Sequence, residues 1–183
     1  KSKFGRHVDV ISGVVATEEG ANNLYNAGAD AVRVGVGPGT ICVTRVVTGV
    51  GVPQITAVMN ASRAARRWKK TVLCDGGTKN SGDIVKGLAA GSSAVVVGSQ
   101  FAGTDEAPGK LVEKNGRFFK SYNASTSYAE KKNHIDKKSA SSKTYIKHIE
   151  GVESLVLYKG ALSQIIENTV ANLKSGYSYS GAK

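Results

Sequence analysis

The stretch DAVRVGVGPGTICVTR, residues 30–45, carries the strongest structural signal of the chain. Residues 30–36 form a valine-rich run without polar alternation, which is typical of a strand in a parallel sheet covered on both faces. Gly37 and Gly39 follow, and glycine lets the backbone turn tightly and approach a ligand closely. The stretch therefore predicts an α/β fold in which Cys42 lies in a loop after a parallel strand, where such folds bind their ligands.

The sequence on either side repeats the same alternation of strand and helix. We expect further strands at residues 8–15, 71–74 and 94–98, and helices at residues 17–27, 54–68 and 81–90. Thr17 is a suitable N-cap for the first helix, and Gly28 follows its end. Four successive βα units predict either a βα barrel or a doubly wound sheet.

The pattern changes after Gly103. Residues 110–120 predict a β-hairpin that turns at Asn115-Gly116. Residues 121–142 are polar and rich in lysine, which is the composition of a mobile loop and favours a lid. An amphipathic helix is expected at residues 163–173, before a tail of glycine, serine and tyrosine.

Length and composition narrow the class of protein. The 183 residues fit one domain, and no apolar run approaches the ~20 residues that span a bilayer. Cys42 and Cys74 are too few for a disulfide framework, which favours a reducing, cytoplasmic setting. Because the chain begins with Lys1 instead of Met, we expect its amino end to be processed, cut or incompletely represented.

The formal net charge of +11 raises the question of nucleic-acid binding. The positive residues are scattered from Lys1 to Lys183, and no basic motif interleaved with aromatic residues accompanies them. We therefore expect no nucleic-acid partner. Attraction of an anionic small substrate or of an acidic partner explains the charge better.

Cys42 is the candidate nucleophile. A thiolate in this loop can attack an electrophilic ring or carbonyl carbon. Thr40 offers a hydroxyl suited to a phosphate oxygen, and Thr44 can share a proton with a reacting group. The alternative is an inert cysteine packed in a tight turn, and packing is the favoured role of Cys74 at the end of an apolar strand.

Two further strand ends carry polar groups. Asp75-Gly76-Gly77 offers a carboxylate for a sugar diol and backbone amides for a phosphate, and Gly98-Ser99 repeats the amide and hydroxyl. Because adjacent parallel strands end at one edge of a sheet, these groups predict a phosphate cradle beside Cys42. His7, His134 and His148 share no metal-ligand spacing.

Residues 35–54, GVGPGTICVTRVVTGVGVPQ, closely resemble the cysteine loop of the IMP dehydrogenase/GMP reductase family. Other segments resemble the family in the same order: LCDGGTKNSGDIVKGLAAG at 73–91, VVVGSQFAGTDEAPG at 95–109, IEGVESLVLYKG at 149–160 and LKSGYSYSGA at 173–182. The family fold is a (β/α)₈ TIM barrel. The resemblance implies that residues 1–183 are the carboxyl-terminal half of this barrel, its last four βα units, with a hairpin and mobile lid at 110–148. The first half, and any regulatory domain, would then lie outside the chain.

The resemblance also implies roles for individual residues. Cys42 would attack C2 of the purine ring of a 5′-monophosphate, with Thr44 and Glu150 handling protons. The implied substrate contacts are Thr40, Gly77, Gly98, Ser99 and Tyr122 to the phosphate, Asp75 to the ribose and Ser125 in the base-gripping segment. Carbonyls of Gly37, Gly39 and Cys42 would line a potassium site. NAD or NADP would exchange hydride with C2, and relatives assemble as homotetramers.

The chain departs from the family pattern in three places. Gly13-Val14 stands where the family usually has Gly-Asn, and the base-gripping segment 122–127 reads YNASTS in place of a Gly-Met motif. The Arg-Tyr pair by which IMP dehydrogenases activate water is replaced by SSKTY at 141–145, and no arginine follows Arg117. Lysine is a poor substitute for a planar guanidinium.

The departures bear on which reaction to expect. GMP reductases release ammonia with the thiol, a threonine and a glutamate, and residues 127–134, SYAEKKNH, are similar to the reductase lid. Residues 49–54, 106–109 and 149–160 are more similar to dehydrogenases. We favour GMP reductase, with IMP dehydrogenase as the alternative and a non-catalytic nucleotide-binding homologue as the third possibility.

Overall fold

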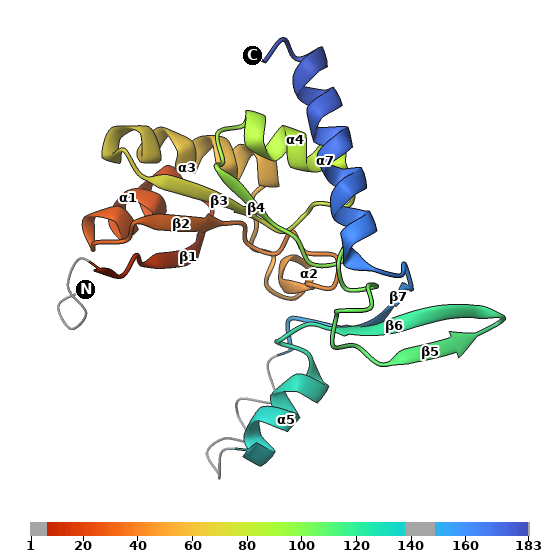
Figure 1. Ribbon diagram of the computed structural model, residues 1–183. Coiled ribbons are helices and arrows are strands. Elements are labelled where there is room, and N and C mark those ends of the chain that lie inside the picture. The colour runs from red at the N-terminus through yellow and green to blue at the C-terminus, as the bar shows by residue number, and fades with distance from the viewer. Residues whose placement is uncertain (1–6, 138–148, 183) are drawn as a thin grey trace.

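The computed structural model describes residues 7–137 and 149–182. Its centre is a parallel sheet with the strand order β1-β2-β3-β4 (Figure 1). The strands are β1 (Ile11–Val15), β2 (Ala31–Val34), β3 (Thr71–Asp75) and β4 (Ala94–Val96). This confirms the predicted α/β fold with a parallel sheet, although β1 begins later than residue 8 and β4 ends before residue 98.

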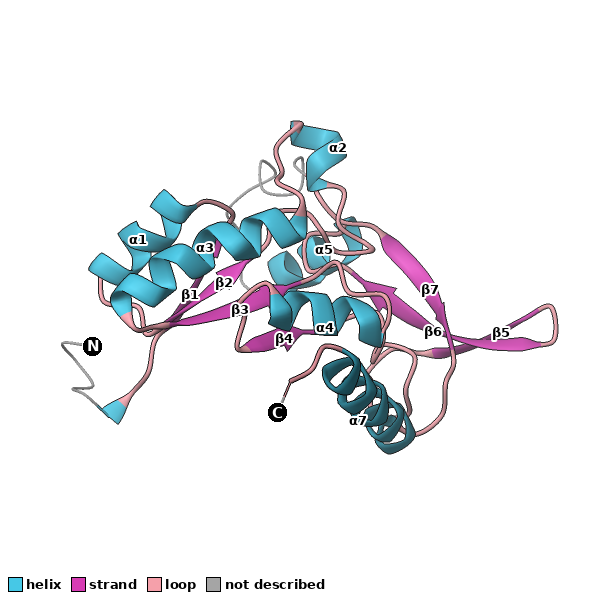
Figure 2. Cartoon of the chain, turned by 90° about the horizontal axis from the view of Figure 1, so that it is seen from above, coloured by secondary structure: helices cyan, strands magenta, loops and turns pink. Residues whose placement is uncertain are grey.

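Three helices connect these strands and pack together over the sheet (Figure 2). They are α1 (Glu18–Asn26), α3 (Gln54–Trp68) and α4 (Ser81–Ala89), close to the predicted ranges. Thr17 Oγ1 accepts a hydrogen bond from the backbone N–H of Gly20 at 3.0 Å, as expected of an N-cap. Asn80 caps α4 in the same way, since its Oδ1 accepts from the N–H of Asp83 at 3.0 Å.

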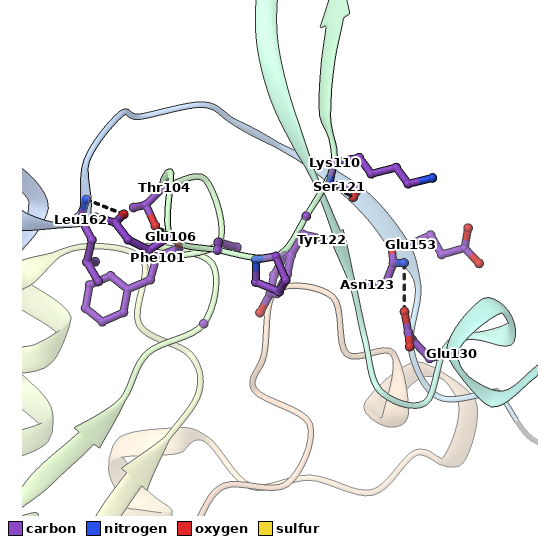
Figure 3. A pocket seen from close by; sticks show the side chains of 15 residues that line it. Phe101, Thr104, Glu106, Lys110, Ser121, Tyr122, Asn123, Glu130, Glu153 and Leu162 are labelled. Atoms are coloured by element: carbon purple, nitrogen blue, oxygen red, sulfur yellow. Dashed lines mark hydrogen bonds between the residues drawn. The ribbon is translucent and has the colours of Figure 1, made fainter. Parts of the chain in front are cut away.

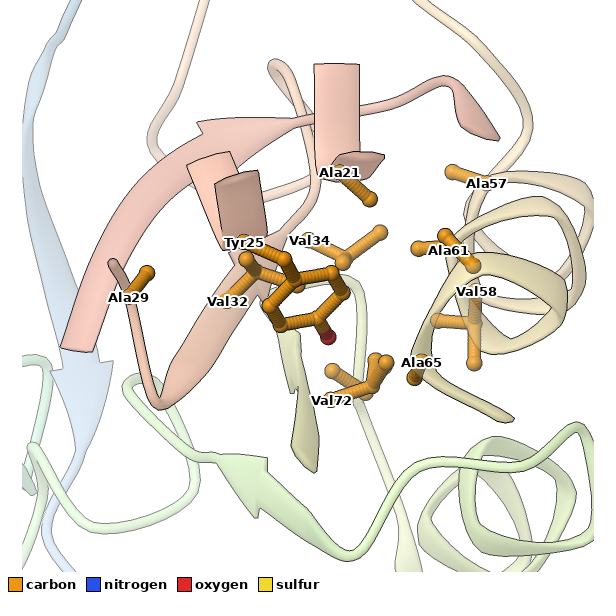
Figure 4. Packing of buried hydrophobic residues seen from close by; sticks show 12 residues of the cluster. Ala21, Tyr25, Ala29, Val32, Val34, Ala57, Val58, Ala61, Ala65 and Val72 are labelled. Carbon is orange, nitrogen blue, oxygen red and sulfur yellow. The ribbon is translucent and has the colours of Figure 1, made fainter. Parts of the chain in front are cut away.

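The hydrophobic core lies between the sheet and helices α1 and α3 (Figure 4). Small residues of the two helices meet valines of β2 and β3, which allows close approach of helix and sheet. The buried cluster consists of Ala21, Tyr25, Ala29, Val32, Val34, Ala57, Val58, Ala61, Ala64, Ala65, Val72 and Cys74. Side chains on the other face of β1, such as Ile11 and Val14, remain exposed.

A second, antiparallel sheet follows the first, in the order β5-β6-β7. Its strands are β5 (Leu111–Lys114), β6 (Arg117–Asn123) and β7 (Glu153–Leu157). Asn115 and Gly116 join β5 to β6 with φ values of +53° and +72°, which a two-residue hairpin turn requires. The predicted hairpin is therefore confirmed, and it projects from the body of the molecule (Figure 1).

Several elements differ from the expectation. The segment expected as a loop from residue 121 contains the end of β6 and the helix α5 (Tyr128–Lys137), while residues 138–148 of the expected lid lie outside the described residues. Two short elements were not expected: α2 (Thr44–Thr48) after the cysteine, and β7, which pairs with β6. The sequence of β7 is ambiguous by itself, and its pairing with β6 decides its conformation.

The final helix, α7 (Leu162–Tyr179), is longer than the predicted 163–173. Gly176 lies where α7 crosses α4, because a Cβ there would come within 2.8 Å of Val85 Cγ2. Close packing between the two helices thus outweighs the weak helix propensity of the Gly/Ser/Tyr tail. Within the described residues, no helix has both the length and the apolar character needed to cross a membrane.

The parallel sheet of the described chain does not close into a barrel. Strands β1 and β4 each pair with one neighbour only, so the sheet has two open edges. All four strands nevertheless point the same way, and their carboxyl ends lie at one edge. This edge carries the loops that begin at Gly35, Gly76 and Val97.

Tyr25 offers a test of this core. Its side chain is 2% exposed, its hydroxyl donates to the Thr71 carbonyl at 2.9 Å, and burial raises its pKa to about 12. The unfolded chain loses this proton near pH 10 while the folded protein keeps it, so the contribution of Tyr25 to stability falls as the pH rises from 10 to 12. At neutral pH, Tyr25→Phe should lower the free energy of unfolding by about 1 kcal/mol.

Urea unfolding of the wild type and of Tyr25→Phe at pH 8, 10 and 11 measures this difference. It should shrink at the highest pH, whereas Tyr179→Phe, which alters an exposed ring, should match the wild type throughout. A difference that stays constant up to pH 11 would contradict the proposed pKa linkage.

Candidate active site

The cysteine loop leaves β2 in a conformation that only glycine adopts easily. Gly35 has a φ of +144°, and a Cβ there would lie 2.3 Å from the carbonyl oxygen of Asp75. The loop therefore passes in direct contact with the end of β3. This close approach brings the cysteine loop beside the Asp75-Gly76-Gly77 segment.

Arg45 holds the loop in shape. Its Nε donates to the Val36 carbonyl at 3.0 Å, and its Nη2 donates to the Val52 carbonyl at 2.7 Å. The N–H of Cys42 donates to the Gly39 carbonyl at 3.1 Å and closes a turn around the cysteine. One guanidinium thus connects the outgoing and returning arms of the loop, with Cys42 between them.

A distant segment completes the site. The N–H of Val43 donates to the Glu150 carbonyl at 2.9 Å, and the N–H of Val152 donates to the Ile41 carbonyl at 3.0 Å. These bonds form an antiparallel bridge between Cys42 and Gly151. The bridge places the side chain of Glu150 next to the cysteine loop.

The three side chains predicted to be catalytic form a chain of polar contacts. Cys42 Sγ lies 3.1 Å from Thr44 Oγ1, and Thr44 Oγ1 donates to Glu150 Oε2 at 2.6 Å. A hydroxyl between a thiol and a carboxylate can accept a proton from one side and deliver one to the other. The arrangement therefore suits acid–base chemistry at an atom bonded to the sulfur.

These groups open into a cavity of about 470 Å³, which is within the range of small-molecule sites. Its walls come from β1, β2, the cysteine loop, the end of β3, β6 and the segment before β7. The lining includes Val14, Arg33, Gly37, Gly39, Cys42, Thr44, Asp75, Gly76, Tyr122, Ala124, Ser125, Thr126 and Glu150. The predicted catalytic trio thus shares one cavity with Asp75, Tyr122 and Ser125.

Asp75 is anchored inside this cavity. Its Oδ2 accepts a hydrogen bond from Arg33 Nε at 2.9 Å and forms an ion pair with Nη2 of the same guanidinium. The Asp75 side chain is 17% exposed, and both contacts with Arg33 use the same oxygen, Oδ2. Arg33 thus holds the carboxylate at the wall of the cavity, where a carboxylate can accept hydrogen bonds from hydroxyl groups.

The expected phosphate contacts lie close together at the same edge. Thr40 Oγ1 donates to Ser99 Oγ at 3.4 Å, which joins the cysteine loop to the end of β4. Gly98 faces the Tyr122 hydroxyl, since a Cβ there would lie 2.4 Å from it. Burial raises the pKa of Tyr122, so its hydroxyl stays protonated and remains a donor. Gly77 packs beneath Pro38 of the cysteine loop.

A second cavity, of about 1020 Å³, adjoins the first at Tyr122 and Asn123 (Figure 3). Carboxylates project into it, but each already has a partner. Glu106 accepts from the Leu162 N–H at 2.9 Å, Glu130 from Asn123 Nδ2 at 3.3 Å and Glu153 from the Ala129 N–H at 3.2 Å. The wall of the larger cavity is therefore structural, and the reactive groups face the smaller one.

The whole chain, residues 1–183, matches the model of the IMP dehydrogenase / GMP reductase domain. The chain belongs to this family. Inosine-5′-monophosphate dehydrogenase of Streptococcus pyogenes is 51% identical over 176 residues, which is 94% of this chain and 36% of that protein. The same enzyme of Aquifex aeolicus is 49% identical, over 96% of this chain and 36% of the relative.

A solved structure gives the same assignment from coordinates. The fold superposes with a TM-score of 0.89 on a cysteine-to-alanine variant of GMP reductase from Trypanosoma brucei, determined in complex with guanosine 5′-monophosphate. That chain is 42% identical, and the match covers 96% of this chain and 35% of the other. The chain therefore spans about a third of the length of the relatives it matches.

The structure adds residues that the sequence analysis did not identify. Arg33 is the partner of Asp75, Arg45 braces the cysteine loop, and Gln54 connects the ends of β2 and β3. An arginine inside a valine-rich strand was a signal that could have pointed to Arg33. The other two act through backbone carbonyls, which a sequence pattern does not display.

Metal binding has little support from the described side chains, among which no three of His, Cys, Asp and Glu gather as a metal site. His7 is exposed, and the side chains of His134 and His148 lie outside the described part. The carbonyl of Gly39 already accepts the Cys42 N–H. A potassium ion bound there would have to share that oxygen.

The two cysteines should differ sharply towards alkylation. Cys42 is half-buried and lines the cavity, whereas Cys74 is 1% exposed and burial raises its pKa. Brief treatment with iodoacetamide at pH 8, followed by peptide mass spectrometry, should label Cys42 at least about 100-fold faster than Cys74. Both should react in urea, and equal rates in the folded protein would contradict this assignment.

Proposed function

We propose that the chain carries the catalytic cysteine site of a purine-nucleotide oxidoreductase, and that its reaction is the reduction of GMP with NADPH to IMP, ammonia and NADP. The observation that carries the proposal is the hydrogen-bonded chain Cys42–Thr44–Glu150 at the wall of a small-molecule cavity. A thiol linked through a hydroxyl to a carboxylate suits addition to an electron-poor ring carbon with removal of an amine.

The chain's own residues divide the chemistry between them. The Cys42 thiolate adds to C2 of the purine, and the C2–N bond breaks as the exocyclic amine leaves as ammonia. Glu150 supplies the proton for that departure through the Thr44 hydroxyl, 2.6 Å away. When bound, a nicotinamide cofactor would supply the hydride that C2 requires. The C–S bond then breaks, and the thiolate of Cys42 is regenerated.

Binding groups for the nucleotide surround this trio. Asp75, oriented by Arg33, accepts the ribose hydroxyls. Thr40, Gly77, Gly98, Ser99 and Tyr122 hold the phosphate with hydroxyl and backbone N–H donors, which is the donor chemistry that phosphate requires. Ser125 contacts the base. The carbonyls of Gly37, Gly39 and Cys42 would line a potassium site, with the Gly39 carbonyl shared with the Cys42 N–H.

Val14 and Arg33 line the wall of the cavity near the ends of β1 and β2. Val14 offers apolar contact to a nicotinamide ring and no hydrogen bond, in contrast to the asparagine usual in the family. We assign no residue of this chain to the choice between NAD and NADP.

The preference for the reductase rests on the lid sequence. Hydrolysis of a covalent adduct requires a base that activates water, and residues 141–145, SSKTY, offer a lysine where dehydrogenases have arginine. Protonation of the leaving ammonia requires only Thr44, which contacts Cys42, and Glu150, which contacts Thr44. IMP dehydrogenase is the second candidate, because the relatives named above are dehydrogenases at 49–51% identity.

The rest of the barrel is part of the same proposal. The open edges at β1 and β4 suit pairing with further βα units, so that residues 1–183 form the carboxyl-terminal half of a (β/α)₈ barrel. We propose that the complete protein acts in the cytoplasm as a homotetramer. Its basic surface attracts the anionic nucleotide.

An absorbance assay at the reduced-cofactor band tests the reaction. The complete protein given GMP and NADPH should consume NADPH and release ammonia, because Glu150 and Thr44 can protonate the leaving amine. Given IMP and NAD, it should produce little NADH. Cys42→Ala should abolish turnover and retain GMP binding, since the phosphate and ribose contacts come from other residues. NADH formed faster from IMP would instead establish the dehydrogenase.

Glu150→Gln separates proton transfer from binding. The amide keeps a hydrogen-bond acceptor for Thr44 but has no proton to exchange, so kcat should fall by about 10²–10⁴ with nucleotide affinity within about threefold of wild type. Glu153→Gln makes the same change at a carboxylate outside the smaller cavity and should leave kcat nearly unchanged. Equal losses in both variants would remove Glu150 from its proposed role.

A further inference from the structure

Gln54, the first residue of α3, places its side-chain amide between the ends of two strands. Its Nε2 donates to the Val34 carbonyl at 2.7 Å, and it lies 3.3 Å from the Asp75 carbonyl and 3.4 Å from Cys74 Sγ. Val34 ends β2 and Asp75 ends β3. One amide therefore binds the last residues of the two strands that carry the nucleophile loop and the ribose carboxylate.

The position of this contact is significant. The ladder between β2 and β3 ends at the pair Val34↔Cys74, and the two loops of the site begin just beyond it. The carbonyls of Val34 and Asp75 point to the same amide, so Gln54 extends the connection past the last pair. Because both acceptors are carbonyls, only the NH₂ group of the side chain can face them.

Two glycines of the functional loops pack closely against Gln54. A Cβ at Gly35 would lie 2.8 Å from Gln54 Oε1 and 2.3 Å from the Asp75 carbonyl. A Cβ at Gly77 would approach Pro38 of the cysteine loop and, at 3.7 Å, the aliphatic part of Gln54. Gly35 of the cysteine loop and Gly77 after β3 therefore both pack against the side chain of Gln54.

Gln54 also leaves its own oxygen unsatisfied. Oε1 is buried and has no hydrogen-bond partner among the described residues. A buried amide oxygen without a donor disfavours folding. The presence of glutamine at position 54 is therefore better explained by the loop geometry that its NH₂ group imposes than by a gain in folding stability.

We propose that Gln54 is a positioning residue, which sets the separation between the Cys42 loop and the Asp75 carboxylate and so aligns purine C2 with the sulfur. The inference rests on the proposed nucleotide chemistry of this cavity. Gln54 touches no reacting atom. It acts through the backbone at Val34 and Asp75, from which the two functional loops begin.

Two variants of the complete protein test the inference. Gln54→Glu keeps the shape of the side chain. When ionised, the glutamate turns an acceptor oxygen towards the Val34 and Asp75 carbonyls; when protonated, it offers one donor to them. Gln54→Met keeps the length and removes all donors. The titratable groups that face the amide are the Cys74 thiol and Asp75, with Arg33 beyond it, so wild type is measured at each pH as the reference. Gln164→Glu on the exposed face of α7 controls for the added charge.

The readouts are the dissociation constant for GMP, kcat and the melting temperature at pH 6.0 and 8.5. We expect Gln54→Glu at pH 8.5 to weaken GMP binding about tenfold and lower kcat about tenfold, with partial recovery at pH 6.0. Gln54→Met should show similar losses at both pH values, and Gln164→Glu should match wild type.

The outcomes are distinguishable. A lower melting temperature with unchanged GMP affinity and kcat in both Gln54 variants would make Gln54 merely structural and overturn the inference. Variants that match wild type in all readouts would overturn it as well. If wild type itself neither binds nor converts a purine nucleotide, the proposed function fails, and the inference fails with it.

Discussion

The site depends on a short antiparallel pairing between the cysteine loop and the segment before β7. Two backbone hydrogen bonds, from Val43 to Glu150 and from Val152 to Ile41, connect parts of the chain more than 100 residues apart. Each such bond contributes only about 1 kcal/mol net, while closing a long loop costs several times RT. The pairing therefore requires support from neighbouring structure.

That support comes from the second sheet and from one buried cation. β6 and β7 pair from Phe119↔Leu157 to Asn123↔Glu153, which fixes where the chain returns to the cysteine loop. Lys120, on β6, is 6% exposed and donates to the carbonyls of Thr104, Asp105 and Ala107. Three backbone carbonyls solvate its ammonium in place of water, so the loop after β4 is tied to the second sheet.

Most helices and strands could be predicted from the sequence wherever the signal comes from neighbouring residues. Helix α3 covers the predicted residues 54–68. It begins after Pro53 and ends before Lys69, which adopts the αL conformation. The hairpin follows from Asn115-Gly116. β7 was missed because ESLVL is ambiguous by itself and becomes a strand through β6, and α5 was missed because its composition is polar throughout.

The residues of the candidate site also differ in whether the sequence identifies them. Cys42 and Asp75 follow predicted strands and Gly98 ends one, so the rule that parallel strands present ligand groups at one edge brings them together from sequence alone. Glu150 required the family resemblance, since no local pattern connects it to Cys42. Neither the strand-end rule nor the family resemblance identified Gln54 or Arg45. Their partners are backbone carbonyls, and these become visible only once the loops have coordinates.

The two sheets contribute different groups to the site, and this difference bears on the reaction that we propose. The parallel sheet carries the cysteine loop and Asp75, while Glu150 comes from the segment before β7. In the proposed reaction, the Thr44 hydroxyl, which contacts both Cys42 and Glu150, would assist departure of an amine without any further residue. Activation of water needs an additional base, and a lysine serves only if its surroundings lower its pKa well below 10. The lack of arginine after Arg117, together with the contacts of Thr44 with Cys42 and Glu150, supports the proposed release of an amine over hydrolysis.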